Sequence, residues 1–491
     1  MSEAVLAREL PTGLSVTELA HLVLLERGSS PAGSPADVER VTWWLDSSVP
    51  GSGWSAMGAA ASEDLRTGAG FAVPAPQEPP VPVPGLPEDA PALHGGAVGF
   101  LGYEAAADLE DFRADSRLPR AAPTPDSWWV RVRRHVLIDH PTGRAWAVGD
   151  PAWVRRAADA VRAAVDGAEP EAASPSASGR WGDVVLPAPG RTGYEAAVRT
   201  ALAEIREGNS YEVCLTAEPS APLAGELSLT AALGLYLAQR RANPAPHAAF
   251  LWGGDFAVLC SSPERFLRVE ADGWCEAKPI KGTAARHPDP DVDAAAAREL
   301  AADPKSRAEN LMIADLMRND LSRVCRPGTI RVPVLFGVET YASVHQLVST
   351  VRGRLRPGRT AADLLAACFP PGSMTGAPKP RTLEIIDRLE DRARDLLREP
   401  RVDRRGRDGG PRRRDPHPRA DPRPGPGHDD GQHRCGWCDR RGLGSGGRIR
   451  GDARQAARAP APELADRLTR IPAPQRPARG RHEWVTRGRD G

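Results

Sequence analysis

Several kinds of residue are scarce in this chain of 491 residues. Aromatic residues make up 5% of it, and its seven cysteines are an odd, scattered number that does not form the disulfide framework of a small secreted domain. No apolar run is long enough to cross a bilayer, and the first residues show no basic stretch followed by an apolar core. We therefore expect a soluble, cytoplasmic protein that does not bind membranes.

Net charge is nearly absent, because 65 Lys and Arg balance 64 Asp and Glu. The chain as a whole therefore gives no electrostatic reason to bind nucleic acid. Lysine is scarce too: the four lysines are Lys278, Lys281, Lys305 and Lys379, and they lie within one segment of about a hundred residues. Because the chain uses arginine for almost all of its other basic residues, each of these lysines is a candidate functional residue.

The end of the chain has a different composition from the rest. Residues 401–491 contain 23 Arg, no Lys, 26 Gly and Pro, and nine large apolar or aromatic residues. So few apolar side chains do not bury enough surface to offset the entropy lost when a chain is ordered. We therefore predict that this tail is disordered.

Composition divides the chain into four predicted regions. The first is β-rich, the second is an Ala, Ser, Pro and Gly linker, the third alternates helical and strand-like segments, and the fourth is the tail. Their bounds are 1–166, 167–190, 191–390 and 391–491. Within the third region, a hairpin is predicted around Gly253-Gly254-Asp255. The mixture predicts an α+β fold with a large antiparallel sheet.

Lys281 ends a strand-like segment and precedes Gly282, where the missing side chain would let a ligand approach the backbone. A lysine attacks only as the neutral amine, so a catalytic Lys281 needs a site that lowers its pKa. The alternative is a surface ammonium beside a turn, which is the commoner situation for a lysine.

Glu309 lies on the apolar stripe of a predicted helix, with Ile313 and Leu316 at helical spacing. A buried carboxylate needs a partner, and Mg²⁺ is one choice. Helix capping is the alternative, because Asp303-Pro304 can start the helix and Ser306-x-x-Glu309 matches a capping box.

Three further places carry polar side chains suited to a site. Glu264, in SSPERF between two strands, is a candidate general acid or a solvated loop residue. His345, in the apolar stretch YASVHQLVS, is a catalyst or a hydrogen-bonded core histidine. The loop 371–379, PGSMTGAPK, precedes a predicted helix at 381–389, and its hydroxyls and backbone N–H groups suit an anionic ligand.

These segments follow one another as GNSYEVCLT, SSPERF, KPIKGTAAR, DPKSRAENLMIADLMRNDL, YASVHQLVS and FPPGSMTGAPK, over about residues 194–390. The stretch GGAVGFLGYE supports the resemblance further upstream. In this order they resemble the chorismate-utilising enzymes, and most closely the aminodeoxychorismate synthase component I family. The resemblance implies a layered α/β/β/α fold, with chorismate and Mg²⁺ bound in a cleft between β-sheet and helices.

The resemblance also implies a reaction, the conversion of chorismate and ammonia to 4-amino-4-deoxychorismate for p-aminobenzoate and folate synthesis. Lys281 would be the nucleophile that adds to the chorismate ring and expels its hydroxyl. Glu264 would protonate the departing hydroxyl, and ammonia would then displace the lysine. Anthranilate synthase component I typically has alanine at the position of Lys281, so this lysine separates the two activities.

The remaining roles are carried over in the same way. Glu309 would bind the Mg²⁺ that holds the substrate carboxylate, and His345 matches the family's active-site histidine. Ser373, Thr375 and Gly376 would cradle an anionic group. Ammonia normally comes from a separate glutamine amidotransferase subunit, and because this chain lacks a GxCxGxQ-like motif, such a partner is implied.

After Glu390 the chain departs from the family pattern. The expected RGxYSGxxGW-like segment, the strand containing IRT and the helix with a second magnesium-binding glutamate do not occur. Read one base later, GC-rich codons for residues 396–409 can encode SSGSLGWIGGDGT, and those for residues 435–444 can encode AGGAIVADSD. We therefore interpret the residues from about 391 onward as a frameshift product and predict that the chain as written is inactive.

Two other functions stay open at this point. One is anthranilate synthase component I, which a fluorescent product would reveal. The other is an inactive chorismate-fold protein whose Arg-rich tail binds nucleic acid electrostatically.

Overall fold

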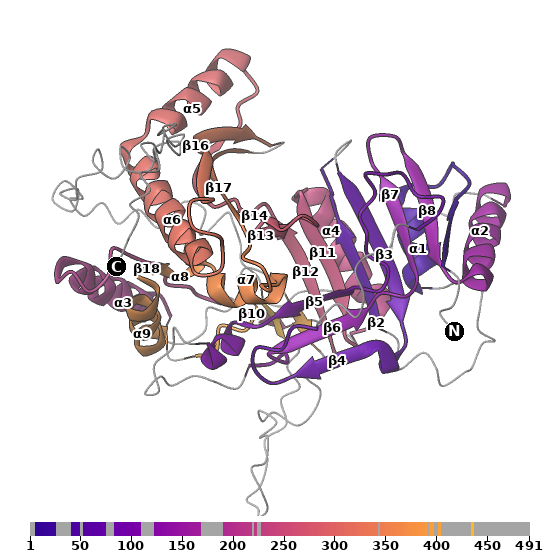
Figure 1. Cartoon of the computed structure of the whole chain (residues 1–491), viewed down its shortest axis with the longest axis horizontal. Helices are drawn as coiled ribbons and strands as arrows, with labels where there is room; N and C mark the ends of the chain where they lie inside the picture. Colours follow the sequence, from indigo (N-terminus) through magenta and orange to yellow (C-terminus); the bar gives the residue numbers. More distant parts are fainter. Residues whose placement is uncertain are drawn as a thin grey trace, which may run out of the picture. The chain divides into compact units, whose positions relative to one another are not determined.

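The structure is a computed structural model that describes residues 5–25, 41–49, 53–74, 83–109, 122–167, 190–218, 220–222, 227–341, 344–390, 392–396, 401–403 and 434–436. Helices and strands alternate through these residues (Figure 1). The helices are α1 (Val16–Leu25), α2 (Pro151–Asp166), α3 (Gly190–Arg206), α4 (Leu229–Ala242), α5 (Pro290–Ala302), α6 (Pro304–Ser322), α7 (Ala361–Cys368), α8 (Gly372–Thr375) and α9 (Lys379–Glu390).

A ten-stranded antiparallel sheet joins strands that are far apart in the sequence. In spatial order its strands are β1 (Leu6–Glu9), β8 (Arg144–Gly149), β7 (His135–Asp139), β3 (Trp54–Ala60), β2 (Val41–Asp46), β11 (His247–Trp252), β12 (Phe256–Ser262), β19 (Arg401–Asp403), β20 (Arg434–Gly436) and β10 (Ser220–Pro222). Trp44 of β2 lies opposite Phe250 of β11. The predicted regions 1–166 and 191–390 therefore contribute strands to one sheet.

A second, five-stranded sheet carries the segment with Lys281. Its strands are β13 (Leu267–Val269), β14 (Trp274–Ala277), β17 (Val344–Arg354) and β15 (Ile280–Ala285), with β16 (Arg331–Thr340) also paired to β17. Two smaller sheets complete the described residues: β18 (Gly376–Ala377) with β9 (Glu212–Val213), and β4 (Leu65–Gly68), β6 (Ser127–Arg131) and β5 (Ala97–Leu101).

Local sequence explains several of these elements. The predicted hairpin is β11–β12, and Gly254 in its turn has a φ of +92°, which a residue with a side chain rarely adopts. Helix α6 begins at Pro304, and the Asp303 carboxylate accepts the Ser306 N–H at 2.9 Å as its N-cap. The segment 211–216, YEVCLT, has the β-branched and aromatic residues typical of a strand, but only Glu212–Val213 pairs with another strand.

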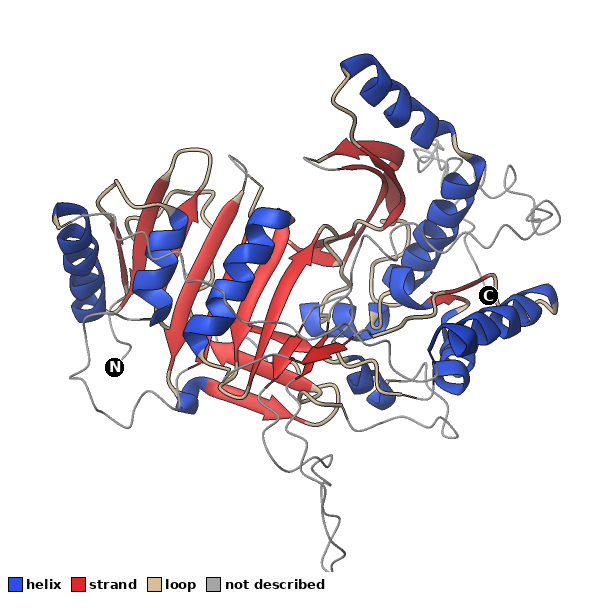
Figure 2. Cartoon of the chain, turned by 180° about the vertical axis from the view of Figure 1, so that it is seen from behind, coloured by secondary structure: helices blue, strands red, loops and turns tan. Residues whose placement is uncertain are grey.

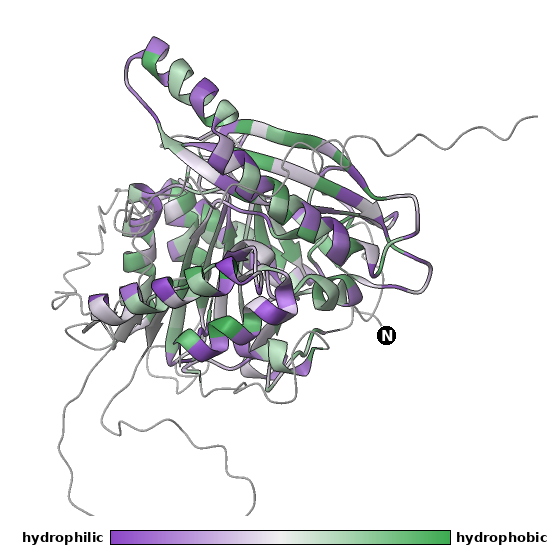
Figure 3. Ribbon diagram, turned by 90° about the vertical axis from the view of Figure 1, so that its left-hand side faces the viewer, coloured by the Kyte–Doolittle hydropathy of each residue, from purple (hydrophilic) through white to green (hydrophobic). Residues whose placement is uncertain are grey.

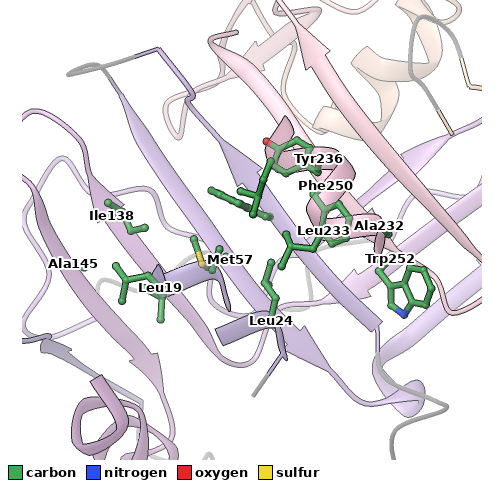
Figure 4. Packing of buried hydrophobic residues seen from close by; sticks show 14 of the residues in the cluster. Leu19, Leu24, Met57, Ile138, Ala145, Ala232, Leu233, Tyr236, Phe250 and Trp252 are labelled. Atoms are coloured by element: carbon green, nitrogen blue, oxygen red, sulfur yellow. The ribbon is translucent and has the colours of Figure 1, made fainter. Parts of the chain in front are cut away.

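The main core lies between one face of the ten-stranded sheet and the helices α1, α2 and α4. Figure 2 shows these helices in front of the sheet strands, and Figure 4 shows the cluster of apolar side chains between them. Leu24, Leu233 and Phe250 are fully buried there, and Tyr236 lies 5.6 Å from Phe250 between ring centroids. Burial of such side chains gives the largest favourable contribution to the folded state.

Among the described residues, two of the three further apolar clusters are large, and they also bury side chains between sheets and helices or between two sheets. One, with Trp43, Trp128 and Trp146, connects the ten-stranded sheet to the β4–β6–β5 sheet. The other packs Ile313 of α6 against Val351 of β17. Hydropathy colouring in Figure 3 shows hydrophilic and hydrophobic residues alternating along the helices, as expected for helices with one face on a sheet.

The predicted α+β fold of large antiparallel sheets covered by helices is confirmed. The bounds of the four predicted regions stay predictions. Residues 168–189 of the predicted linker, and the tail except for residues 392–396 and strands β19 and β20, lie outside the described residues. Among the residues that are described, the search for a helix of sufficient length and hydropathy to span a membrane finds none.

Candidate active site around Lys281

Lys281 lies on β15, and its side chain is 15% exposed, so it is not the surface ammonium of the alternative interpretation. Its Nζ donates to the Glu212 Oε1 at 2.6 Å and to the Ser373 carbonyl oxygen at 3.2 Å. These partners come from β9 and α8, so three segments distant in the sequence meet at this amine. The geometry gives Lys281 a defined position and an adjacent proton acceptor.

Gly282 has a different role from the one predicted. Its φ is +98°, and a Cβ placed there would lie 2.8 Å from the Ser306 Cβ on α6. The missing side chain therefore makes room for α6 and not for a ligand. Close packing of α6 on β15 is the consequence.

Glu264 lies in the loop between β12 and β13, close to the same loop that contacts Lys281. The Ser373 hydroxyl donates to the Glu264 Oε1 at 2.9 Å. Ser373 thus contacts Lys281 through its carbonyl and Glu264 through its hydroxyl. Glu264 and Ser373 line a small depression together with apolar side chains such as Phe266 and Met317.

The loop that carries Ser373 is held by buried contacts (Figure 1 shows α8 and β18 between α6 and α9). The Lys379 Nζ lies 2.8 Å from the Asp320 Oδ2 and 2.9 Å from the Cys368 carbonyl oxygen, with both charged side chains almost fully buried. The Thr375 hydroxyl donates to the Pro371 carbonyl oxygen at 3.0 Å. Buried ionic and hydrogen-bond contacts therefore hold the loop in one conformation.

Gly376 is required by the backbone at this point. Its φ is +129°, and a Cβ there would lie 1.9 Å from the Glu212 carbonyl oxygen. A larger residue would separate β18 from β9, which carries Glu212. That Ser373, Thr375 and Gly376 cradle an anion stays a prediction.

Glu309 does not belong to a capping box. Asp303 caps α6, and the Glu309 Oε1 lies 3.7 Å from the Lys305 Nζ, one turn earlier on the helix. The Glu309 side chain is 36% exposed, so it lies at the edge of the buried stripe. The capping alternative is therefore removed, and a metal role for Glu309 stays a prediction.

His345 is a buried residue at the start of β17, opposite Ala284 of β15. Its Nδ1 lies 2.9 Å from the Thr340 Oγ1, and its Nε2 lies 2.9 Å from the Asp293 Oδ1. These hydrogen bonds go to groups other than Lys281 and Glu264. Within the described residues the structure thus gives His345 the contacts of a hydrogen-bonded core histidine, and its catalytic role stays a prediction.

Glu212 was missed by the sequence analysis. It lies in the middle of YEVCLT, an otherwise strand-like segment, and a charged residue at such a position was the available signal. Burial raises the pKa of Glu212 and the negative charge of Glu309 adds to this, whereas the Lys281 ammonium opposes it.

Arg394 was also missed, because it lies beyond Glu390 in the segment interpreted as frameshifted. Its side chain is 1% exposed and contacts both Glu390 carboxylate oxygens at 2.7 Å. It also donates to the carbonyl oxygens of Met374 and Cys214, at 2.8 and 2.7 Å. Arg394 therefore joins the Ser373 loop to the strand segment that follows Glu212.

The N-terminal region contacts this arginine through Glu104. The Glu104 carboxylate accepts the Arg394 N–H at 2.7 Å and the Asp395 N–H at 3.0 Å. Burial raises the pKa of Glu104 to about 7, although the hydrogen bond from the Arg394 backbone opposes the shift. The contacts of the folded region thus continue to Asp395.

A magnesium site is not complete in the part of the chain that the structure describes. Within those residues, no group of three or more His, Cys, Asp and Glu side chains is placed to hold a metal ion. Glu309 is a single carboxylate beside a lysine, whereas Mg²⁺ prefers several oxygen ligands. The described residues by themselves therefore do not form a site that fits Mg²⁺.

Comparison with protein families matches residues 51–396 to the family described as chorismate binding enzyme. Among curated proteins, the chain is 43% identical over 327 residues to aminodeoxychorismate synthase of Streptomyces pristinaespiralis, covering 63% of this chain and 43% of that protein. It is 45% identical over 314 residues to aminodeoxychorismate synthase of Streptomyces griseus, covering 62% and 42%. The chain thus spans less than half the length of these two relatives.

Similarity extends to anthranilate synthases. The chain is 40% identical over 329 residues to anthranilate synthase component 1 of Streptomyces coelicolor, covering 64% of this chain and 62% of that protein. Among solved structures, anthranilate synthase component I from Streptococcus pneumoniae is similar with a TM-score of 0.53 and 24% identity, covering 79% of this chain and 85% of that chain. This likeness shows the fold.

Proposed function

Because the chain belongs to the chorismate-binding enzyme family, we propose that it specifies the chorismate-aminating component of an aminodeoxychorismate synthase. In this reaction chorismate and ammonia give 4-amino-4-deoxychorismate and water. The similarity to the two Streptomyces synthases supports the choice of product. The product would be used for p-aminobenzoate and folate synthesis.

The position of Lys281 is the observation that carries this proposal. Its Nζ lies 2.6 Å from the Glu212 Oε1 and 3.2 Å from the Ser373 carbonyl oxygen, and Ser373 in turn donates to Glu264. A nucleophile beside a base, with an acid reached through one residue, is the arrangement that covalent catalysis needs.

The proposed chemistry balances over two steps. The lone pair of the neutral Lys281 amine forms a bond to the chorismate ring while the ring C–O bond breaks, and Glu264 gives its proton to the departing oxygen, which leaves as water. Ammonia then forms the new C–N bond, and Lys281 leaves as the free amine. In this scheme Ser373, Thr375 and Gly376 bind an anionic group of the substrate. His345 on β17 is a further catalytic residue whose role is left open.

Anthranilate formation is the second candidate, and one relative supports it: the 40% identical anthranilate synthase component 1. Lys281 favours amination at the para carbon instead, because the resemblance implies alanine there in anthranilate synthases. A fluorescent anthranilate product would overturn the proposal.

Two further participants are part of the proposal. A glutamine amidotransferase subunit would supply ammonia. Relatives from Klebsiella aerogenes and Salmonella typhimurium are named aminodeoxychorismate synthase component 1, and this name supports a two-component enzyme. Glu309 is proposed as a Mg²⁺ ligand, and when bound the metal would offset the charge of the substrate carboxylate.

The test is Lys281→Ala in a form of the chain whose family-like reading frame continues after Glu390. We expect formation of 4-amino-4-deoxychorismate from chorismate and ammonia to fall by about 1,000-fold, or about 4 kcal/mol of barrier, because the nucleophile is lost. Lys278→Ala, in the short connection between β14 and β15, serves as the control and should retain activity. Unchanged product formation by Lys281→Ala would contradict the proposal.

A further inference from the structure

We propose that Glu212 accepts a proton from the Lys281 ammonium and so makes the amine that attacks; this role rests on the function proposed above. Lys281 and the carboxylate beside it are each only 15% exposed, and such a pair either stays ionic or shares its proton as amine and acid. The contacts that Glu212 makes determine whether the ammonium–carboxylate form or the amine–carboxylic acid form is favoured.

Backbone pairing fixes Glu212 at this place. Ala377 of β18 lies opposite Glu212 of β9, and Gly376 permits the close approach of the two strands. The same loop supplies Ser373, whose carbonyl holds the Lys281 Nζ. The carboxylate and the amine are therefore brought together by rigid backbone contacts and not by a flexible surface loop.

The two oxygens of Glu212 have different surroundings. Oε1 contacts the Lys281 Nζ at 2.6 Å, whereas Oε2 is buried and has no hydrogen-bond partner among the described residues. A buried carboxylate with one unpaired oxygen is destabilised as an anion, and a proton on it removes the charge. The charged groups that act on Glu212 are Lys281 on β15 and Glu309 on α6, and burial with Glu309 outweighs Lys281 in raising its pKa.

A second Lys–Glu pair, between Lys278 in the connection from β14 to β15 and Glu339 on β16, stays ionic and shows which contacts keep it so. The Lys278 Nζ also lies 2.6 Å from a carboxylate, that of Glu339, and both side chains are about twice as exposed as those of the first pair. The second Glu339 oxygen accepts the Tyr341 hydroxyl at 2.7 Å. Burial raises the pKa of Glu339, but hydrogen bonds from Lys278 and Tyr341 outweigh it, so the net shift is downward. The two pairs have the same N–O distance, but of the two only the Lys281–Glu212 pair has surroundings that favour transfer of the proton to the carboxylate.

The step is a single proton transfer. One Nζ–H bond of Lys281 breaks and an O–H bond forms on Glu212, so the ammonium and the carboxylate become an amine and a carboxylic acid with no change in total charge. The lone pair left on Nζ then forms the bond to the chorismate ring. When ammonia displaces Lys281, Glu212 returns the proton and the pair is restored.

The experiment measures the reactivity of Lys281 in the full chain without chorismate. The chain is treated with a trace of acetic anhydride between pH 6 and 8, and acetylation at each lysine is measured by peptide mass spectrometry. Exposed Lys305 is the internal standard, and its rate should rise about tenfold per pH unit because only the neutral amine reacts. If Glu212 takes the proton, the fraction of neutral Lys281 stays nearly constant, and its rate should change less than about threefold over this range.

Variants and controls identify the acceptor. In Glu212→Gln the flat profile of Lys281 should become a titration with a clear midpoint, whereas Glu212→Asp should keep a flat profile. Lys278 should follow Lys305 in the parent chain and in Glu339→Gln. Buried Lys379 reports folding, because it acetylates slowly only in a folded chain.

Two outcomes overturn the role of Glu212: a Lys281 rate that rises as steeply as that of Lys305 in the parent chain, or a profile in Glu212→Gln as flat as in the parent. Either result leaves the proposed function standing if Lys281→Ala still abolishes the product. A retained product in Lys281→Ala instead overturns the function, whatever the titration shows.

Discussion

His135 is fully buried and Lys281 is mostly buried, both on β-strands, but their surroundings differ. His135 of β7 is 1% exposed in the tryptophan-rich core, and neither ring nitrogen has a hydrogen-bond partner among the described residues. Lys281 is held by a carboxylate and a carbonyl oxygen. Burial lowers the pKa of His135 to about 3, and the charge of His94 adds to this, so the ring is neutral at physiological pH.

The same difference extends to the neighbours of each residue. Around the loop 371–379, the buried charges are paired, as in Lys379 with Asp320 and Arg394 with Glu390. In the core around His135, by contrast, the ring of His135 itself is buried, neutral and without a hydrogen-bond partner among the described residues. A buried polar group by itself therefore does not indicate a site, whereas several paired buried charges near a candidate nucleophile make a region a candidate site.

The largest effect is expected when the family segments that are missing after Glu390 are added to the chain, because they would complete the region around Lys281. We expect the chain as written to be inactive with ammonia, chorismate and Mg²⁺, and a version with the frame restored after Glu390 to turn over. The restored segment should supply core strands and a second carboxylate for the metal. Side-by-side assays check this, and comparable turnover by the two chains would show that the residues after Glu390 are functional or dispensable as they stand.

The next largest effect is on stability. Lys379→Met should lower the free energy of unfolding by about 3–5 kcal/mol, because it leaves the Asp320 carboxylate buried without its ammonium. Urea unfolding measures this, and the double change with Asp320→Leu should recover part of the loss. Lys305→Met, at an exposed pair, should change stability by less than about 0.5 kcal/mol. Equal losses of stability in Lys379→Met and Lys305→Met would show that the buried pair stabilises the fold no more than the exposed pair does.

A smaller effect concerns the metal. Glu309→Gln keeps the size and hydrogen-bonding reach of the side chain but removes the charge, so Mg²⁺-dependent binding of chorismate should weaken by about tenfold or more in the frame-restored chain. Calorimetric titration of chorismate at several Mg²⁺ concentrations checks this. Glu299→Gln, at an exposed position on α5, is the control, and unchanged binding in Glu309→Gln would exclude the ligand role.

The smallest effect is expected at His135. Its pKa is lowered from 6.5 to about 3 on folding, so the unfolded chain binds a proton more readily, and stability falls as the pH drops through 6.5 toward 3. Between pH 7.5 and 5.5 this amounts to about 1 kcal/mol. His135→Phe should remove that part of the loss, measured by urea unfolding at the two pH values. An identical pH dependence in both chains would mean that the ring is paired in solution.

The sequence alone determined features that depend on neighbouring residues. The hairpin at Gly253-Gly254-Asp255, the start of α6 at Asp303-Pro304 and the order of the family motifs were all predictable, because turns, caps and motifs are local. The scarcity of lysine also directed attention to Lys281. Local patterns failed where two interpretations fitted equally well, as for Glu309 between capping and metal binding.

Tertiary structure alone decided which side chains meet. Lys281 is 69 residues from Glu212 and 92 from Ser373 in the sequence, and Glu264 is 109 residues from Ser373. These contacts arise from the pairing of β9 with β18 and the packing of α6 on β15, which no local pattern specifies. The reason is physical: a strand segment determines which of its faces is apolar, but its partner strand is chosen by the packing of the whole core.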